Sequence, residues 1–116
     1  MTKKDIAIAF STGCFEKTFQ FLNEKIEWKI IGENCFTGKA DVVTNCKQTA
    51  EYFKSVTTDF AIEHIIEEHN YIAITGSAKF SKEGALLAHI SACDVYEFNE
   101  ENQIVKISSY CISEKK

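Results

Sequence analysis

The sequence contains no proline, so its turns must rely on glycine, asparagine, aspartate and serine. Long apolar runs are also missing, and no window approaches the roughly 18 apolar residues of a transmembrane helix. The apolar stretch near the N-terminus is short and is interrupted at Ser11 and Thr12, unlike the core of a signal peptide. We therefore expect a cytoplasmic protein without a membrane partner.

Dense positive charge is absent as well. The net charge is −4, and the lysine pairs lie at the two ends of the chain, Lys3-Lys4 and Lys115-Lys116. Nucleic acids and anionic membranes bind to clustered positive charge. We expect neither of them as a partner.

Metal-binding spacing is the third absence. No Cys-x-x-Cys pair occurs among the five cysteines, Cys14, Cys35, Cys46, Cys93 and Cys111. The three histidines, His64, His69 and His89, do not form a recognisable metal set either. We predict no metal and no cofactor, and reduced thiols that act mostly as small apolar side chains. A catalytic role for one of the cysteines stays open.

The chain has enough apolar residues for one real core. It has 116 residues, of which 45% are hydrophobic and 12% aromatic, including nine phenylalanines. This is the size of one domain, covering 1–116, and too short for two. The aromatic side chains must be housed in a core, a pocket or an interface.

Helical spacing marks the first half of the chain. Apolar residues recur one turn apart up to Gly13, which can end a first helix. A second short helix is expected from Phe15 to Leu22, and a third from Lys39 to Ser55. Between them, 25–32 alternates as a strand does and 33–38 is expected to be a loop.

Strand patterns fill the second half. Alternation begins after Val56, and turn residues separate four strands at 68–70, 81–84 and 99–102. Gly76 is predicted to mark a bulge or a close approach of two backbones. Helices followed by an antiparallel meander indicate an α+β fold, and such a long sheet must curl because strands twist.

Three stretches resemble the nuclear transport factor 2-like superfamily, in particular its SnoaL-like group. They are the helix break Ala9–Phe15, the segment from Trp28-Lys29-Ile30-Ile31-Gly32 to Phe36-Thr37-Gly38-Lys39, and the hairpin from Asp94–Asn99 to Gln103–Ile107. Two positions depart from the pattern, with Ile31 in place of proline and Cys14 in place of aspartate. The resemblance implies a cystatin-like cone, in which three N-terminal helices pack on a strongly curved, mostly antiparallel sheet around an internal pocket.

Asp94 is the strongest candidate for chemistry, because it lies in a strand of apolar and small residues. A carboxyl that faces an apolar cavity has a raised pKa, which suits a general acid or a neutral hydrogen-bond donor. The alternative is that Asp94 points outward into solvent. The resemblance aligns it with the aspartate that donates to the oxyanion in ketosteroid isomerases. The base of those enzymes would fall at Lys29 or Ile30, and their tyrosine near Ile6, so the same reaction by the same residues is not expected.

His64 is the second catalytic candidate, because simple alternation places it on the face of Phe60, Ile62 and Ile66. A partly buried structural histidine is the alternative. We also predict an apolar or aromatic ligand. Its pocket would be lined by bulky residues, namely Phe10, Phe19, Trp28, Ile30, Tyr52, Phe53, Phe80, Tyr96 and Tyr110. Each of these could instead fill the core or lie at a dimer face.

Apolar residues fall on both faces of the predicted sheet. Ile65, Ala73, Thr75, Val95 and Ile107 have the opposite parity to Ile66, Ile74 and Asp94. An apolar face is normally covered, and relatives pair through it, so a homodimer is expected. Two functions follow. One is a small-molecule-binding domain, with isomerase, cyclase or dehydratase chemistry on an apolar carbonyl compound if it is an enzyme. The other is a non-catalytic protein-binding or dimerisation module that uses the outer sheet face.

Overall fold

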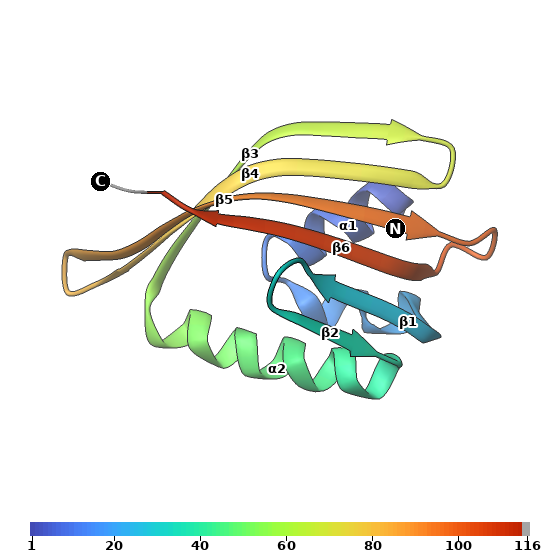
Figure 1. Cartoon of the computed structure of the whole chain (residues 1–116), viewed down its shortest axis with the longest axis horizontal. Helices are drawn as coiled ribbons and strands as arrows, with labels where there is room; N and C mark the ends of the chain where they lie inside the picture. The colour runs from blue at the N-terminus through green and yellow to red at the C-terminus, as the bar shows by residue number, and fades with distance from the viewer. Residues whose placement is uncertain (115–116) are drawn as a thin grey trace.

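The computed structural model describes residues 1–114, which form two α-helices, one 3₁₀ helix and six strands. In chain order the elements are α1 (Lys3–Ser11), η1 (Phe15–Phe21), β1 (Leu22–Ile30), β2 (Asn34–Thr37), α2 (Lys39–Ser55), β3 (Thr57–Glu68), β4 (Tyr71–Lys82), β5 (Ala85–Phe98) and β6 (Ile104–Ser113). One sheet contains all six strands in the order β2-β1-β6-β5-β4-β3. Its pairs are antiparallel except for β1 with β6. The predicted α+β class is confirmed, with a curved sheet and α1 and α2 packed beside it (Figure 1).

Helix α1 begins with a capping box. The Thr2 hydroxyl accepts the Asp5 backbone N–H at 3.1 Å, and the Asp5 carboxylate accepts the Thr2 N–H at 3.1 Å. The buried residues recur at helical spacing, namely Ile6, Ala7, Ala9 and Phe10. The helix ends at Ser11, and Gly13 has a φ of 83°, a left-handed conformation that glycine adopts without strain. The predicted helix end is therefore confirmed.

The second predicted helix is the 3₁₀ helix η1. Because a 3₁₀ helix has three residues per turn, Phe15 and Thr18 share its buried face. Phe19 is turned aside and packs at the margin of the core. Leu22, expected to be part of this helix, is the first residue of β1, so that strand begins earlier than predicted.

The predicted loop at 33–38 contains the short strand β2, which pairs antiparallel with β1. Four residues are too few to show a periodicity, which is why the sequence pattern did not reveal this strand. On its other side β1 runs parallel to β6 and places Trp28 beside Ile107 and Ile30 beside Ser109. The parallel pairing of β1 with β6 thus brings side chains from the first and the last strand of the chain together.

A β-bulge interrupts β3 at Glu63. Ile62 pairs with Gly76, but His64 already pairs with Thr75, so Glu63 is an extra residue without a partner. A Cβ on Gly76 would overlap the Ala61 carbonyl oxygen, so only glycine allows the two strands to approach this closely. The predicted bulge or close approach at Gly76 is confirmed.

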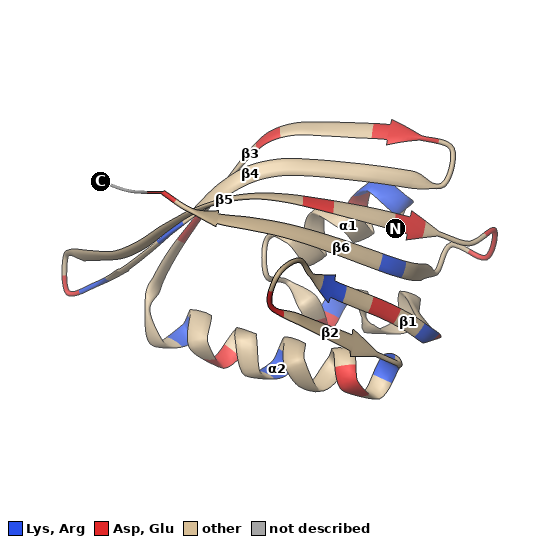
Figure 2. Ribbon diagram, viewed as in Figure 1, with Lys and Arg blue, Asp and Glu red and all other residues tan. Residues whose placement is uncertain are grey.

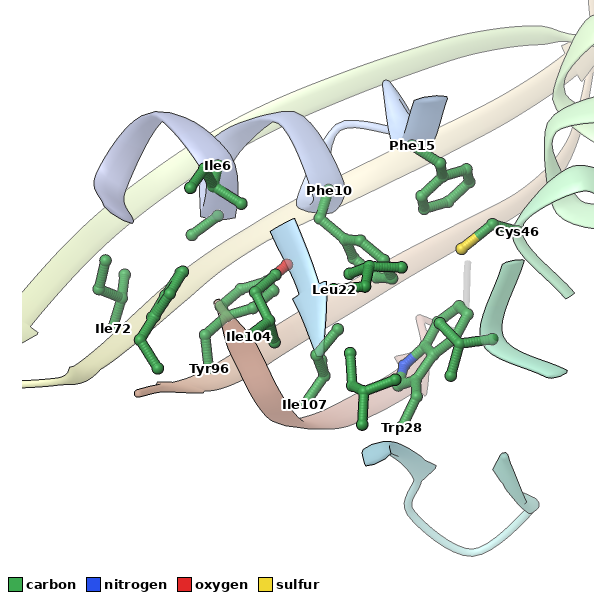
Figure 3. Packing of buried hydrophobic residues seen from close by; sticks show 14 of the residues in the cluster. Ile6, Phe10, Phe15, Leu22, Trp28, Cys46, Ile72, Tyr96, Ile104 and Ile107 are labelled. Atoms are coloured by element: carbon green, nitrogen blue, oxygen red, sulfur yellow. The ribbon is translucent and has the colours of Figure 1, made fainter. Parts of the chain in front are cut away.

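Helices and sheet meet in a core of buried apolar side chains. Ile6 and Phe10 of α1 lie over Tyr96 of the sheet, while Trp28 lies farther along beside Cys46 of α2 (Figure 3). Phe10 contacts the Trp28 ring edge-to-face, with ring centroids 5.0 Å apart. This core closes one end of the space between α1 and the sheet.

Charges of both signs are interspersed along α2 and the strands (Figure 2). In α2, for example, Lys54 and Glu51 approach to 3.9 Å on the exposed side. The face that α2 turns inward is apolar and includes the buried Val42 and Cys46. The inward face of α2 is therefore apolar, while its charged residues lie on the exposed side.

Candidate functional site

A cavity of about 280 Å³ lies between the end of α1, α2 and the inner face of the sheet. Aromatic side chains form much of its wall, namely Phe10, Phe15, Trp28, Phe53, Phe60 and Phe80. Small residues on β4 and β5 leave the hollow open, because Gly76 pairs with Ala92 where larger residues would fill it. Asp94 is the only acidic residue of this lining, and none of the described lining residues is a lysine, an arginine or a histidine.

Asp94 is held at the cavity wall by the last residue of α1. Ser11 Oγ donates to Asp94 Oδ2 at 2.8 Å, and it also bonds the Tyr96 hydroxyl. Burial raises the pKa of Asp94, and hydrogen bonds from Ser109 and Ser11 offset part of that rise. A carboxyl with a raised pKa stays protonated at a higher pH than a solvated one, so it can donate a hydrogen bond.

Ser109 faces Asp94 from the neighbouring strand β6. It is buried, and its Oγ accepts the indole N–H of Trp28 at 3.0 Å. The parallel pairing of β1 with β6 brings Trp28 to this position. Two polar groups thus meet at the carboxyl, Ser11 with Tyr96 on one side and the Trp28–Ser109 pair on β1 and β6 on the other.

His64 lies on the outer face of the sheet, the face turned away from α1 and the cavity. Its Nδ1 is 3.1 Å from Thr75 Oγ1, and the side chain is exposed. The expectation that it shares a face with Phe60 and Ile62 is wrong, because the bulge at Glu63 shifts the alternation by one residue. Asp94 and His64 are therefore not brought together.

The bulge and the strand register also revise the assignment of the two faces. Ile65 pairs with Ile74 and packs toward the core, and Ile107 is completely buried opposite Tyr96. Both were expected on the outer face. Parity along one strand says nothing about a neighbouring strand until the register is known.

Five predicted lining residues lie at the cavity, namely Phe10, Trp28, Ile30, Phe53 and Phe80. Four others lie elsewhere, namely Phe19, Tyr52, Tyr96 and Tyr110. The 3₁₀ geometry of η1 turns Phe19 away from the cavity. Tyr96 is buried in the core, and its hydroxyl bonds Ser11. Tyr52 is 47% exposed because it lies one helical step from Phe53, and Tyr110 is 46% exposed because it follows the inward Ser109.

Sequence reasoning missed Ser11 and Ser109 as site residues. Both contact partners at least 80 residues away in the chain, and no local pattern records such a contact. The available signal was a hydroxyl at the end of an apolar helix face, one residue after Phe10. A second signal was Ser109 between Ile107 and Cys111 in a strand of otherwise inward apolar character.

Within residues 1–114, no group of three or more His, Cys, Asp and Glu side chains could hold a metal ion. No helix there is long and apolar enough to cross a membrane. The five cysteines are free thiols.

The helices, the curved sheet and the cavity between them define an α+β cone. An NTF2-like (nuclear transport factor 2-like) protein of unknown function from Cytophaga hutchinsonii has 35% sequence identity to the chain, with a TM-score of 0.85 over 94% of this chain and 95% of that one. The chain belongs to the NTF2-like family.

More distant solved structures share the fold alone. A protein assigned as a SnoaL-like polyketide cyclase from Shewanella denitrificans is 13% identical, with a TM-score of 0.72 over 95% of this chain and 90% of that one. An LEH-like epoxide hydrolase of M. tuberculosis is 13% identical, with a TM-score of 0.68 over 90% of this chain and 74% of that one. No protein-family model and no curated protein matches the chain.

Proposed function

We propose that this NTF2-like chain is a single SnoaL-like domain that binds a small, largely apolar molecule, with Asp94 holding the polar end. The observation that carries the proposal is one buried carboxyl in the wall of an open, otherwise apolar cavity. Such a cavity with a few convergent polar groups is the usual form of a small-molecule site. A cavity filled by aromatic side chains would have favoured the alternative, a protein-binding or dimerisation module.

The chemistry we propose for this site is proton donation from Asp94 to an apolar carbonyl compound, of the isomerase, cyclase or dehydratase type. The raised pKa of Asp94 supports this role, because a neutral carboxyl can donate to a carbonyl oxygen. The cyclase and hydrolase assignments of the neighbours with the same fold are compatible with it. His64 has no part in the proposed chemistry, since it lies outside the cavity. The free cysteines are compatible with a reducing cytoplasmic location.

The test compares a cavity-blocking variant with a matched variant on the outer face. Ala92 lines the cavity, whereas Ala73 lies on the same sheet and points outward. Binding of acetophenone and of ethylbenzene, two aromatic probes of similar shape, is followed by ligand-observed NMR. We expect Ala92→Phe to abolish binding of both probes and Ala73→Phe to leave it unchanged. Equal binding by both variants, or no binding by the wild type, would overturn the proposal.

We also propose that two copies of the chain pair through the outer sheet face, which is the second candidate function. The observation in favour is that large apolar side chains are exposed there, Ile66 by 61%, Tyr110 by 46% and Ile112 by 67%. An exposed apolar face of this kind is typically covered by a partner.

Multi-angle light scattering should give the mass of a dimer. Tyr110→Lys should give a monomer, while Ile31→Lys, an exposed change at the β1–β2 turn, should stay dimeric; a wild-type monomer would refute the pairing.

A further inference from the structure

We propose that Phe53 determines the length of ligand that the inner cavity takes, because its ring and that of Phe15 form a wall between this cavity and a second hollow on the surface. The site therefore takes compact molecules and gains no affinity from a long alkyl chain. This inference rests on the proposed function for its ligand, and it deepens that function by limiting the length of the molecule.

The second hollow is a groove of about 1010 Å³ between η1 and α2, called here the η1–α2 groove. Its apolar lining includes Phe19, Ala50 and the buried Cys46, and lysine and glutamate side chains border it. Gly13 and Phe15 line both the groove and the inner cavity. The two hollows are therefore adjacent and share part of one wall.

One face of α2 contributes to both hollows. Thr49 and Phe53 line the inner cavity, whereas Cys46 and Ala50 line the η1–α2 groove. These four positions are spaced by three and four residues, so they lie along one face of the helix. The boundary between the cavity and the groove thus passes between Ala50 and Phe53.

The Phe53 ring closes this boundary against the turn that follows α1. It stacks on Phe15, with ring centroids 6.1 Å apart and 23° between the planes, and on Phe80 at 5.5 Å and 16°. A Cβ on Gly13 would lie 3.0 Å from two carbons of the Phe53 ring, so the glycine lets the ring fit closely against the turn. Phe53 therefore blocks the passage from the cavity to the groove.

The cavity opens to solvent at the sheet. Two of its lining residues, Ile62 on β3 and Cys111 on β6, are exposed. An alkyl chain that leaves by this route returns to water, so its added methylenes bury no apolar surface. A chain that passed into the groove would instead tighten binding about fourfold for each buried methylene. The dependence of affinity on chain length therefore measures whether the wall is closed.

Three exposed thiols distinguish these routes without any added label. Cys111 lines the cavity, Cys14 lines the groove, and Cys35 lines neither of them. A ligand in the cavity should slow the alkylation of Cys111 by iodoacetamide. Only a chain that reaches the groove should slow the alkylation of Cys14, and Cys35 serves as the internal control.

The first experiment uses the wild type with acetophenone, butyrophenone and octanophenone, three phenyl ketones of increasing chain length. Affinities are measured by ligand-observed NMR, and alkylation is followed by peptide mass spectrometry. We expect octanophenone to bind no more tightly than butyrophenone, and every probe to slow the alkylation of Cys111 alone. Binding of octanophenone about tenfold more tightly than butyrophenone, or protection of Cys14, would overturn the inference.

The second experiment removes the wall. In Phe53→Ala, octanophenone should bind at least about tenfold more tightly than butyrophenone and should slow the alkylation of Cys14. Phe60→Ala is the matched control, because Phe60 lines the cavity and contacts Phe53 at 5.4 Å but does not line the groove. It should leave Cys14 unprotected. Protection of Cys14 in Phe60→Ala, or none in Phe53→Ala, would contradict the role of Phe53. If Phe53→Ala does not fold, the wild-type series still decides whether the wall is closed.

Failure of the proposed function gives a different result. If no phenyl ketone slows the alkylation of Cys111 in the wild type, the cavity does not bind these probes, and the proposed function is overturned together with the inference. If acetophenone protects Cys111 and octanophenone protects Cys14 as well, the proposed function stands and only the inference is overturned.

Discussion

Asp94 is held in a position that favours its neutral form. Burial removes the carboxyl from water, and the two hydroxyl hydrogen bonds offset only part of that penalty. A side chain in this state opposes folding when it is ionised, and it is retained without an ion-pair partner among the described lining residues. Residues of this kind occur at functional sites more often than elsewhere.

The first prediction concerns the stability of Asp94→Asn as a function of pH. Because burial raises the folded pKa of Asp94 above its usual value, the stability that Asp94 contributes is fully present below that usual value and is lost as pH rises through the folded pKa. Asp94→Asn should therefore have a higher free energy of unfolding than the wild type at pH 7, and this advantage should vanish at low pH. Urea unfolding across the pH range measures it. Asp59→Asn, at an exposed position on β3, is the control, and an equal advantage at every pH would contradict the assignment.

Gly76→Ala tests the close approach at the bulge. The added Cβ would overlap the Ala61 carbonyl oxygen and lie 3.2 Å from the Ile62 Cα, so backbone must move. We expect a loss of about 2 kcal/mol or more in the free energy of unfolding, measured in urea. Ser77→Ala on the same strand should lose less than about 0.5 kcal/mol. A neutral Gly76→Ala would show that the strands can separate here without penalty.

Some residue positions follow from the sequence and others do not. The local sequence showed that Asp94 interrupts a strand of apolar and small residues, and the pairing of that strand with β4 and β6 places Asp94 in the cavity wall. His64 could not be placed, because one extra residue in β3 reverses the alternation and leaves no local mark except the glycine on the facing strand. Ser11 could be predicted as a site residue only by knowing which strand α1 covers.

At the scale of elements, helix α1 contributes more to the site than its length suggests. It supplies the aromatic ring of Phe10 and the hydroxyl of Ser11 from adjacent positions at its end. A helix of nine residues is marginal by itself, so its start must be fixed by capping and its face by packing. The capping box at Thr2 therefore contributes to the geometry around Asp94.

Thr2→Ala tests this contribution. Loss of the hydroxyl that accepts the Asp5 N–H should lower the free energy of unfolding by about 1 kcal/mol. Thermal unfolding followed by circular dichroism measures the change. Thr57→Ala, an exposed threonine at the start of β3, serves as the matched control and should change stability by less than about 0.5 kcal/mol. Equal effects of the two substitutions would mean that the box is not stabilising.

Element order was largely predictable because the patterns for α1, α2 and β3 to β6 are long. Of the two short elements, the helix at η1 was predicted but its 3₁₀ type was not, and the strand β2 was not predicted at all. A seven-residue 3₁₀ helix and a four-residue strand both lie below the length at which periods of 3.0, 3.6 and 2.0 can be told apart. The parallel pairing of β1 with β6 was also beyond prediction, since it joins segments at opposite ends of the chain.

At the scale of the whole molecule, the reactivity of the cysteines measures local and global unfolding, because the five thiols differ in burial. Burial raises the pKa of Cys46 to about 12, whereas Cys14 and Cys35 are exposed. Thiol reagents attack the thiolate, so at pH 8 only about one Cys46 in ten thousand is in the reactive form even before access is considered.

Alkylation by iodoacetamide at pH 8 should therefore modify Cys14 and Cys35 rapidly and Cys46 only as the protein unfolds. Peptide mass spectrometry over time gives the three rates. Urea should accelerate the Cys46 reaction in parallel with global unfolding and leave the other two rates nearly unchanged. Rapid labelling of Cys46 in native conditions would indicate that α2 separates locally from the core.

The overall architecture was the most predictable level of all. Order of elements, the family resemblance and a curved sheet with helices packed beside it all followed from the chain, because each depends on many residues at once. The cavity depends on a few small residues, such as Gly76 and Ala92, which pair with each other on β4 and β5. A change at either position would alter the interior while leaving the fold in place.

The extra residue in β3 has a consequence for comparing this chain with its relatives. The bulge at Glu63 shifts the alternation of inward and outward side chains by one residue. Inward positions are even-numbered before Glu63 and odd-numbered after it. A relative without the bulge would need a one-residue gap at this point for its later positions to correspond. An alignment that closes the gap would match His64 to an inward position and transfer an active-site role to the wrong side of the sheet. Functional residues should therefore be carried across β3 by their strand partners, Ile74 and Thr75, and never by counting along the chain.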